Sequence, residues 1–513
     1  MSTVIVAAGA RGEADSVAVE DVRRVARAGG VILLASAFGS GLSYAFGMYL
    51  ARRLGPSSFG LYSLGLALFQ ALSLIAVLGL DTGVVKFVSE QIQLGRRSLV
   101  ARTILQAVAV TGLGGLAAGL FVVVLAGPLS LSLYREPELV PVLRFFGAAL
   151  PFAAVGSVLF AALQALHRFG PLVAIRYGWE PSGKFVLAGA FLGLGWGLSG
   201  VLSAVGLTLA VSVAASAFAV AGAIERSQDH AVPHGGELRK LWAFCLPLTA
   251  ATAFNALAPR ADVFLLGFWK GATDVGIYSA AFQTAAILAL VLSAFETVFA
   301  PVIGRALVRA NRSGLAHTFQ SVSRLTWLVT VPIAVCVMTF SADILALFGP
   351  AYVTGAIPLI VLTVGHVIYG AAGTANVVLL MGGHSRLALI NTIALGIGLM
   401  VAAALLVPRW GLLGGAVAAG GTLILTVVVR TIQVWGRYHI HPFSWGLVKQ
   451  AVAGAAMAVA LAATKPLLEP IYDPVLAVAA GCLYLGLLGL LGLDPHDKAA
   501  LRSLLKGEAS VWN

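Results

Sequence analysis

The chain has 513 residues, of which 59% are hydrophobic and only 11% are charged. Soluble domains carry about 25% charged residues, so this composition excludes a soluble protein and indicates one that spans a membrane. The net charge of +12 does not indicate nucleic-acid binding, because most Lys and Arg residues lie in short loops beside apolar segments, where they report topology.

Apolar segments of about 20 residues, the length of a membrane-crossing helix, follow one another along the chain. The 59 glycines and the scarcity of strand-like alternation favour closely packed helices over a β-barrel. We therefore predict an all-α polytopic membrane protein with about fourteen transmembrane helices. The predicted spans are 28–51, 60–88, 99–127, 139–166, 171–194, 196–224, 241–267, 275–304, 316–346, 352–381, 385–407, 411–435, 445–466 and 473–493.

Two phrases occur twice, about 216 residues apart. Duplicated membrane folds place their substrate site where the copies meet, so we predict two parallel six-helix lobes around a central cavity, plus two C-terminal helices. The pattern G-x4-G-[LI]-Y-S occupies Gly55–Ser63 and Gly271–Ser279, the pattern W-G-L-x-G occupies Trp196–Gly200 and Trp410–Gly414, and Gly206 and Thr208 are echoed by Gly420 and Thr422.

Charge sets the predicted orientation, because alternate loops are rich in Lys and Arg and such loops are cytoplasmic. Both termini are then cytoplasmic in a multi-pass protein of the cell (plasma or inner) membrane, and both G-x4-G turns lie outside. The predicted parts are a loose cytoplasmic N-terminal tail at 1–27, an N-terminal six-helix lobe at 28–224, a cytoplasmic linker at 225–240, a C-terminal six-helix lobe at 241–436, two additional helices at 437–493 and a cytoplasmic tail at 494–513.

Two stretches carry a family resemblance. The segment Ala51–Tyr62, continuing to Leu78–Asp81, resembles the A-R-x-L-G-P-x-x-F-G loop of the polysaccharide (O-antigen or repeat-unit) flippases, and Asp262–Gly267 is similar to their D-x-x-L-L-G. This family belongs to the multidrug/oligosaccharidyl-lipid/polysaccharide exporter superfamily. The resemblance covers roughly residues 28–506.

The resemblance implies a transporter rather than an enzyme. Its implied function is to move a polyprenyl-pyrophosphate-linked oligosaccharide from the cytoplasmic to the outer leaflet by alternating access, for cell-surface polysaccharide synthesis. We expect no cofactor, and the coupling ion (proton or sodium) stays open. The expected partners are the lipid-linked oligosaccharide and the bilayer, not nucleic acid. We expect a monomer, acting near glycosyltransferases or a polysaccharide polymerase.

The fifth predicted span, 171–194, carries three charges on one helical face. Arg176, Glu180 and Lys184 fall at i, i+4 and i+8, and the last two lie roughly 14 and 20 Å into the span at about 1.5 Å per residue. Charges at such depth are costly and mark functional sites. We interpret them as a cavity wall whose cations bind the implied pyrophosphate; the alternative is a neutralised salt-bridge ladder packed against another helix. Pro181 should kink this helix.

A second polar face lies on the seventh predicted span. Asn255 and Asp262 share it, and Arg260 lies near its outer end. Asn255 and Arg260 are candidate cavity residues, as is Gln70 at mid-depth in the second span, whereas Asp262 is a candidate gate residue. The structural alternatives are a contact with the N-terminal lobe for Asn255, a bond to a neighbouring helix for Gln70, and an acid that bonds the outer loop for Asp262.

Asp81 and Glu296 occupy nearly equivalent places in the two repeats, close to the predicted cytoplasmic face. With Lys86 and Arg305 nearby, they are candidate gating or coupling residues whose ion pairs break as the lobes rock; interfacial capping is the alternative. His366, about 20 Å into the tenth span, is a candidate proton site because imidazole titrates near neutral pH. The alternative for His366 is a hydrogen-bonded packing residue.

The remaining polar residues indicate no chemistry. Cys245, Cys336 and Cys482 lie within apolar runs at spacings that match no metal site, and they are expected to be small buried hydrophobes. No catalytic or metal-ligating residues are predicted. Arg430 lies near a span end, and its side chain is expected to reach the interface.

Two other function classes remain as alternatives. A cation- or proton-coupled multidrug exporter of the same superfamily would have a cavity that favours acids, whereas the deep charges here have a net positive sign. A membrane-embedded glycan polymerase or ligase would need a long catalytic outer loop, and the predicted outer loops are short.

Overall fold

The computed structural model describes residues 2–224, 256–308, 312–467 and 472–492, together with Cys245 and Phe254. Side chains are described from Leu34 onward, apart from Arg97, Ser98, Val298 and Pro301.

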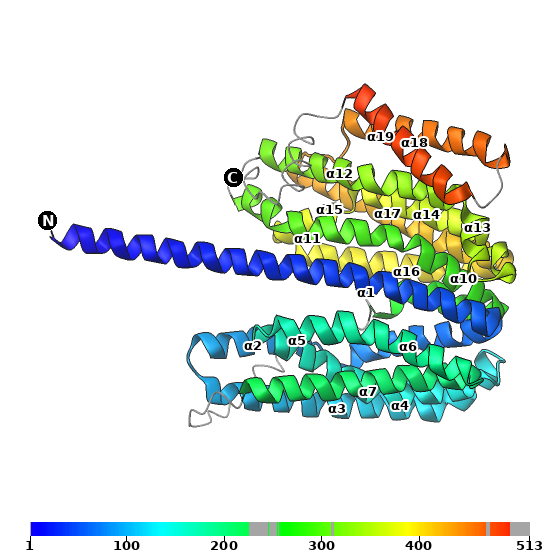
Figure 1. Ribbon diagram of the computed structural model, residues 1–513, viewed down its shortest axis with the longest axis horizontal. Coiled ribbons are helices and arrows are strands. Elements are labelled where there is room, and N and C mark those ends of the chain that lie inside the picture. The colour runs from blue at the N-terminus through cyan, green and yellow to red at the C-terminus, as the bar shows by residue number, and fades with distance from the viewer. Residues whose placement is uncertain are drawn as a thin grey trace. The chain divides into compact units, whose positions relative to one another are not determined.

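All regular elements in this described part are helices (Figure 1). They are α1 (Ser2–Ala76), α2 (Leu80–Gln93), α3 (Arg97–Pro128), η1 (Leu129–Leu133), α4 (Leu139–Ala165), α5 (Phe169–Val173), η2 (Ala174–Trp179), α6 (Glu180–Gly193), α7 (Gly197–Ile224), η3 (Ala258–Arg260), α9 (Ala261–Lys270), α10 (Ala272–Ala285), α11 (Ile287–Val308), α12 (Arg312–Thr339), α13 (Ser341–Ala346), η4 (Pro350–Gly355), α14 (Ala356–Ala372), α15 (Ala375–Met381), α16 (Ser385–Trp410), α17 (Leu412–Tyr438), α18 (Trp445–Thr464), η5 (Lys465–Leu467) and α19 (Asp473–Leu491).

Within the described ranges, eleven helices are long and apolar enough to cross a membrane. The first of them, Leu34–Gln93, contains most of the first predicted span and all of the second. The fifth predicted span is divided among α5, η2 and α6 and carries three charges, and the seventh begins before the described residues resume and ends in α9. The all-helical polytopic fold is therefore confirmed, while the number fourteen stays a prediction.

The N-terminal segment differs from expectation. The helix α1 begins at Ser2, so residues 2–27 are helical, and the expectation of a loose tail is wrong. The reason is that this segment contains many strong helix formers (Ala, Arg and Glu) and lacks proline, so no residue in it breaks a helix that continues into the first span. The predicted linker 225–240 and the predicted tail 494–513 lie outside the described residues.

The helices form two compact units. Unit 1 comprises Met1–Phe46, Ala76–Leu116 and Pro151–Leu246, and unit 2 comprises Gly47–Ile75, Ala117–Leu150 and Pro247–Asn513. The boundaries fall within α1, α3 and α4, so these units are a different division from the two lobes of the sequence repeat. Each unit is described by itself below.

The repeated G-x4-G phrase forms the same backbone turn in both places. Gly55 has φ 76° and ψ 171° within α1, and Gly271 has φ 87° and ψ −179° between α9 and α10. Glycine reaches this positive-φ conformation at little cost, whereas other residues rarely adopt it. The first glycines of the second phrase agree too, since Gly197 and Gly411 have φ of 54° and 55°.

Within unit 2, the two copies of this turn touch each other backbone to backbone. A Cβ on Gly60 would lie 1.7 Å from the carbonyl oxygen of Ala272, and a Cβ on Gly276 would lie 2.1 Å from that of Pro56. The contact is reciprocal, because Pro56 and Ala272 each follow the first glycine of their own copy. The second glycine of the phrase therefore exists for close approach, and we call this contact the glycine crossing.

The later helices of unit 2 pack as one connected bundle. Helix α17 lies against α14 and α16, and α12 lies against α11 and α14 (Figure 1). The two C-terminal helices, α18 and α19, lie side by side and join the bundle through α12. Their shared core includes Val331 and Val335 from α12, Met457 from α18 and Tyr484 from α19.

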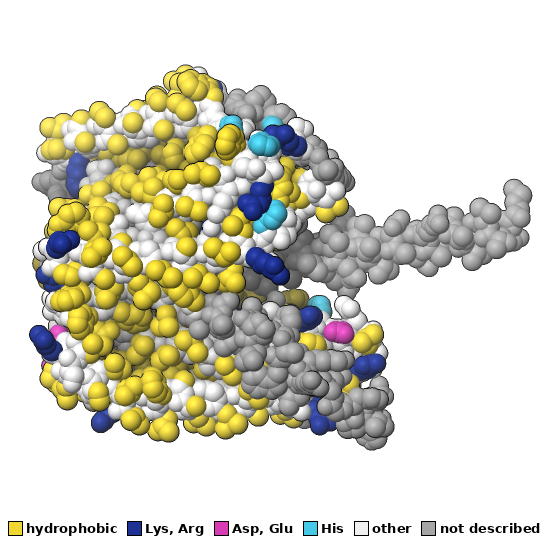
Figure 2. Space-filling view, turned by 180° about the vertical axis from the view of Figure 1, so that it is seen from behind, with side chains coloured by type: hydrophobic (Ala, Val, Ile, Leu, Met, Phe, Trp, Pro, Cys, Tyr) yellow, Lys and Arg dark blue, Asp and Glu magenta, His cyan; other side chains and the backbone are white. Residues whose placement is uncertain are grey.

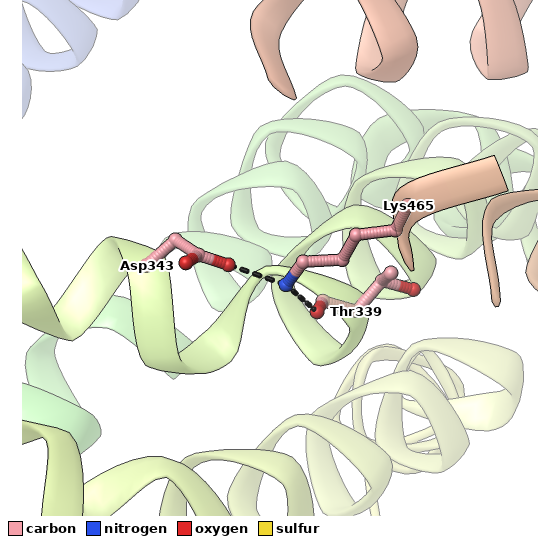
Figure 3. A network of polar contacts seen from close by, with 3 residues as sticks. All are labelled: Thr339, Asp343 and Lys465. Atoms are coloured by element: carbon pink, nitrogen blue, oxygen red, sulfur yellow. Dashed lines mark hydrogen bonds and ion pairs between the residues drawn. The ribbon is translucent and has the colours of Figure 1, made fainter. Parts of the chain in front are cut away.

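A polar contact also fastens α18 to the bundle. Lys465, at the end of α18, forms an ion pair with Asp343 and donates a hydrogen bond from Nζ to the Thr339 carbonyl oxygen at 2.9 Å (Figure 3). Its ammonium group also lies 5.0 Å from the ring centroid of Phe340. The lysine thus joins the C-terminal helices to the α12–α13 corner.

The described surface has the character expected of a protein in lipid. On the face shown in Figure 2, hydrophobic side chains cover most of the described surface, with few charged side chains among them. Large apolar side chains such as Phe218 and Leu490 are more than four-fifths exposed. Exposure on this scale would be costly in water and is favourable against lipid tails.

Candidate functional site

The charged face of the fifth predicted span lies in unit 1, where the helix changes its winding. Residues Ala174–Trp179 form a π-helix, and α6 begins at Glu180 with Pro181 in its first turn. Proline has no amide hydrogen to continue the α-helical pattern, and π-helical turns often occur at functional sites. Where a kink was expected at Pro181, the structure thus has a wider, π-helical segment that ends directly before Glu180.

Arg176, Glu180 and Lys184 interact with one another. Both cations act electrostatically on the Glu180 carboxylate. The guanidinium carbon of Arg176 also lies 5.4 Å from the ring centroid of Phe160 and 5.9 Å from that of Tyr177, within the range of cation–π attraction. Both cations therefore lie near Glu180, as three residues on one helical face would. The structure adds the two aromatic rings that hold Arg176.

Helix α7 presents a polar stripe to this face. Thr208, Ser212 and Ser216 fall at i, i+4 and i+8 and are almost fully buried. Ser212 lies beside the Glu180 carboxylate, and the indole nitrogen of Trp179 donates a hydrogen bond to the Thr208 carbonyl oxygen at 3.3 Å. The charges of the fifth span therefore pack against a stripe of small hydroxyl side chains.

In unit 2, two predicted cavity residues meet. The Nη2 atom of Arg260 donates a hydrogen bond to Oε1 of Gln70 at 3.2 Å, although 190 residues separate them. The guanidinium of Arg260 also lies over the ring of Phe282, 5.5 Å from its centroid. Arg260 ends the short 3-10 turn η3, which contains Pro259. Asn255, the third candidate in this region, lies outside the described residues.

Asp262 lies two residues beyond Arg260 and is 1% exposed. Its carboxylate accepts a hydrogen bond from the Tyr278 hydroxyl and another from the backbone N–H of Val263 at 2.8 Å. Tyr278 is the tyrosine of the second G-x4-G-[LI]-Y-S phrase. This arrangement ties α9 to α10, and both donors lie within these helices rather than in the loop between them.

The four predicted inner-gate residues lie in different settings. In unit 1, Asp81 lies in the first turn of α2 and accepts a hydrogen bond from the Thr82 N–H at 2.7 Å, while Lys86 is exposed on the same helix. In unit 2, Arg305 is exposed near the end of α11. Glu296, on the same helix, interacts electrostatically with Arg430 of α17.

The sequence analysis missed the role of Arg430, which it treated as a snorkelling side chain. The structure places it beside Glu296 and Tyr369, on the face of α17 that also carries Thr422 and Thr426. The signal was present in the sequence: these three residues of α17 fall at i, i+4 and i+8 and repeat the stripe of Thr208, Ser212 and Ser216. His366, another predicted coupling residue, lies on α14 and lines the same cavity as Arg430.

Among the residues that the structure describes, no group of three or more His, Cys, Asp or Glu side chains could hold a metal ion. The three cysteines are free thiols. The charged side chains described above instead pair with acids or lie over aromatic rings, and they belong to predicted membrane-spanning segments. Such sets of side chains inside a polytopic membrane protein can bind and release a charged or polar solute.

The comparisons with known proteins specify the family. The family described as Polysaccharide biosynthesis protein matches residues 25–307, more than half of the chain. The chain belongs to this family, which confirms the resemblance carried by Ala51–Tyr62. The sequence has no significant match among curated proteins.

Solved structures show the same fold. The lipid II flippase MurJ in an inward closed conformation matches with a TM-score of 0.72 at 15% identity, over 90% of this chain and 98% of that chain. An inward-facing multidrug resistance MATE family transporter of the MOP superfamily matches with a TM-score of 0.68 at 16% identity, over 80% and 98%. A MOP superfamily transporter from Pyrococcus furiosus matches with a TM-score of 0.59 at 16% identity, over 80% and 95%. The chain has the fold of these transporters.

Proposed function

We propose that this protein moves a polyprenyl-pyrophosphate-linked oligosaccharide from the cytoplasmic to the outer leaflet of the cell membrane by alternating access. The observation that carries the proposal is membership in the polysaccharide biosynthesis family together with a transporter fold. A polysaccharide pathway that builds its repeat units on a lipid needs a step that transfers them across the bilayer. The proposal assigns that step to this chain.

The distribution of charge supports an anionic rather than a cationic substrate. Three described acids within the predicted spans have a partner: Glu180 has Arg176 and Lys184, Asp262 has the Tyr278 hydroxyl, and Glu296 has Arg430. A cationic drug would compete with these partners. The pyrophosphate would instead gain the guanidinium of Arg176, which is exposed, and the ammonium of Lys184.

The two parts of the substrate have different needs. The pyrophosphate requires cations that are available to it when it binds. The Glu180 carboxylate neutralises Arg176 and Lys184 while the site is empty, and it can release them to a stronger anion. The glycan requires hydrogen-bonding groups and aromatic faces, which Gln70, Arg260 and Phe282 provide in unit 2. The described chain therefore has groups suited to each part.

Substitution of the stripe tests this proposal. Lys184→Ala and Arg176→Ala should abolish complementation of a flippase-deficient strain at unchanged protein abundance, because each removes a proposed phosphate contact. Arg144→Ala is the matched control, since Arg144 is an exposed arginine in another predicted span. Wild-type complementation by both stripe variants would refute the assignment of the stripe.

Transport in reconstituted vesicles tests the function itself. The wild-type protein should accelerate the transfer of a fluorescent polyprenyl-pyrophosphate glycan across the bilayer, measured by quenching of the probe in the outer leaflet. A multidrug exporter of the same fold would instead move a small cation such as ethidium. Movement of ethidium without movement of the lipid-linked glycan would overturn the proposal.

A further inference from the structure

Unit 2 contains the cavity that His366 and Arg430 line. It has a volume of 260 Å³ and lies among η3, α10, α14, α16 and α17. Ligand pockets for drug-sized molecules have volumes of about 300–1,000 Å³, so this cavity suits a smaller ligand. Its lining is mainly apolar, with a few polar side chains, as is usual for a pocket that orients its ligand.

The polar side chains of this cavity are incompletely paired. Neither ring nitrogen of His366, nor Nε of Arg430, has a hydrogen-bond partner within the described part of the chain, and all three atoms are buried. Buried polar atoms without partners are costly. A ligand with hydroxyl groups would satisfy them, because a hydroxyl both donates and accepts.

Two threonines of α17, on the same helix face as Arg430, add acceptors. The hydroxyl of Thr422 donates to the Ala418 carbonyl oxygen at 2.7 Å, and that of Thr426 donates to the Thr422 carbonyl oxygen at 2.7 Å. Each hydroxyl hydrogen is thus used within α17, and the oxygen lone pairs remain as acceptors. The cavity therefore combines donors and acceptors around a small volume.

Aromatic rings form the apolar part of the wall. Phe282 of α10 and Tyr369 of α14 both line the cavity. A pyranose ring has one face of C–H groups, which packs on an aromatic ring, and an edge of hydroxyls that need hydrogen-bond partners. An isoprenoid chain would leave the polar atoms unpaired. An anion would find the charge of Arg430 already offset by the Glu296 carboxylate.

We propose that this cavity is the subsite for one neutral sugar ring of the transported glycan. His366 and Arg430 bind the ring hydroxyls, and Phe282 packs against the C–H face. The proposal rests on the proposed function and names the part of the substrate that this region recognises. Arg260 lies over Phe282, so the sugar subsite adjoins the Arg260–Gln70 pair.

Direct binding of free sugars tests the proposal without transport. The full chain in lipid nanodiscs would be examined by saturation-transfer NMR with the methyl glycosides of glucose, galactose and N-acetylglucosamine. Glucuronate and tetramethylammonium serve as charged comparison ligands. At least one neutral glycoside should receive saturation at its ring C–H protons, and neither charged ligand should displace it.

Variants then locate the binding. His366→Leu should weaken binding of that glycoside about tenfold, because it removes a hydrogen bond, whereas His366→Gln should retain much of it. Thr363→Val is the matched control, since Thr363 is buried on the same helix and is outside the cavity lining. No saturation of any neutral glycoside, preferential binding of glucuronate, or unchanged binding in His366→Leu would each overturn the subsite.

The result also separates the subsite from the proposed function. If the wild-type protein moves the lipid-linked glycan in vesicles but binds none of the glycosides, the subsite falls and the function stands. If it binds a glycoside in a His366-dependent way but moves no lipid-linked glycan, the function falls and the cavity remains a sugar site.

Discussion

The two copies of the repeat agree in their corners and differ in their interior faces. Gly55 and Gly271 have nearly the same backbone conformation. The polar stripe of the sixth predicted span is also repeated on α7 and α17, but Ser216 in the first copy corresponds to Arg430 in the second.

The surroundings of the two stripes differ accordingly. The stripe of α7 packs against the charged face of Glu180 and Lys184. The stripe of α17 brings its own cation and lines an open cavity. The duplication has therefore kept the backbone that shapes the fold while each copy has acquired different polar groups. We place the function in these differences.

The largest effect is expected where the copies agree. Gly60→Ala and Gly276→Ala should each destabilise the protein by about 3 kcal/mol, because the added Cβ would overlap a carbonyl oxygen and overpacking forces the backbone apart. Thermal unfolding of the purified protein in detergent measures this. The two variants should behave alike, since the crossing is reciprocal.

Gly41→Ala is the control for the glycine crossing. A Cβ on Gly41 meets no atom within 4 Å, and alanine favours helix over glycine by about 1 kcal/mol. This variant should unfold at the same temperature as the wild type or higher. Destabilisation confined to one copy of the crossing would contradict its reciprocal geometry.

An intermediate effect is expected where the stripes differ. Arg430→Ser gives the second copy the residue of the first, and it leaves Glu296 without its cation. The transport rate in vesicles should fall about tenfold, a barrier increase of ~1.4 kcal/mol. Arg430→Lys should retain most activity, and Ser216→Ala should retain nearly all. Equal losses in Arg430→Ser and Ser216→Ala would remove the distinction between the copies.

An effect on stability no larger than that of the glycine crossing is expected at the tyrosines of the repeated phrase. Tyr278→Phe removes the hydrogen bond to the buried Asp262 carboxylate, and a hydrogen bond to a charged group contributes about 1.5–3 kcal/mol. Tyr62→Phe is the matched change in the first copy, where the ring packs on Phe146 and the residue equivalent to Asp262 is Phe46. Chemical unfolding should show the larger loss for Tyr278→Phe, and a reversed order would contradict this account.

Local patterns in the sequence predicted most of the fold. Apolar segments predicted the helices, and the spacing of Arg176, Glu180 and Lys184 predicted their shared face. The prediction for the N-terminal segment was wrong because the mixed charges of residues 1–27 resemble a tail, although the segment has no proline and about half of its residues are good helix formers. The π-helix at Ala174–Trp179 was also beyond prediction, because Pro181 specifies a disturbance and not its form.

Contacts between distant segments could not be predicted in the same way. Gln70 and Arg260 were each named as cavity candidates, but nothing local shows that they bond to each other. Arg430 and Glu296 lie on different helices, and their interaction depends on how α11 and α17 pack. The glycine crossing could be predicted only in part. The repeat identifies the second glycine of the phrase, but only three-dimensional packing shows which backbone this glycine approaches.

The glycine crossing has the form of an isologous dimer interface contained in a single chain. In such an interface the same patch appears on both partners, and each residue meets the counterpart of its own neighbour. A change in either copy of the phrase thus alters the shared interface, so the two copies are constrained together. The second glycines are accordingly the positions at which the two halves of this gene have the least freedom to diverge.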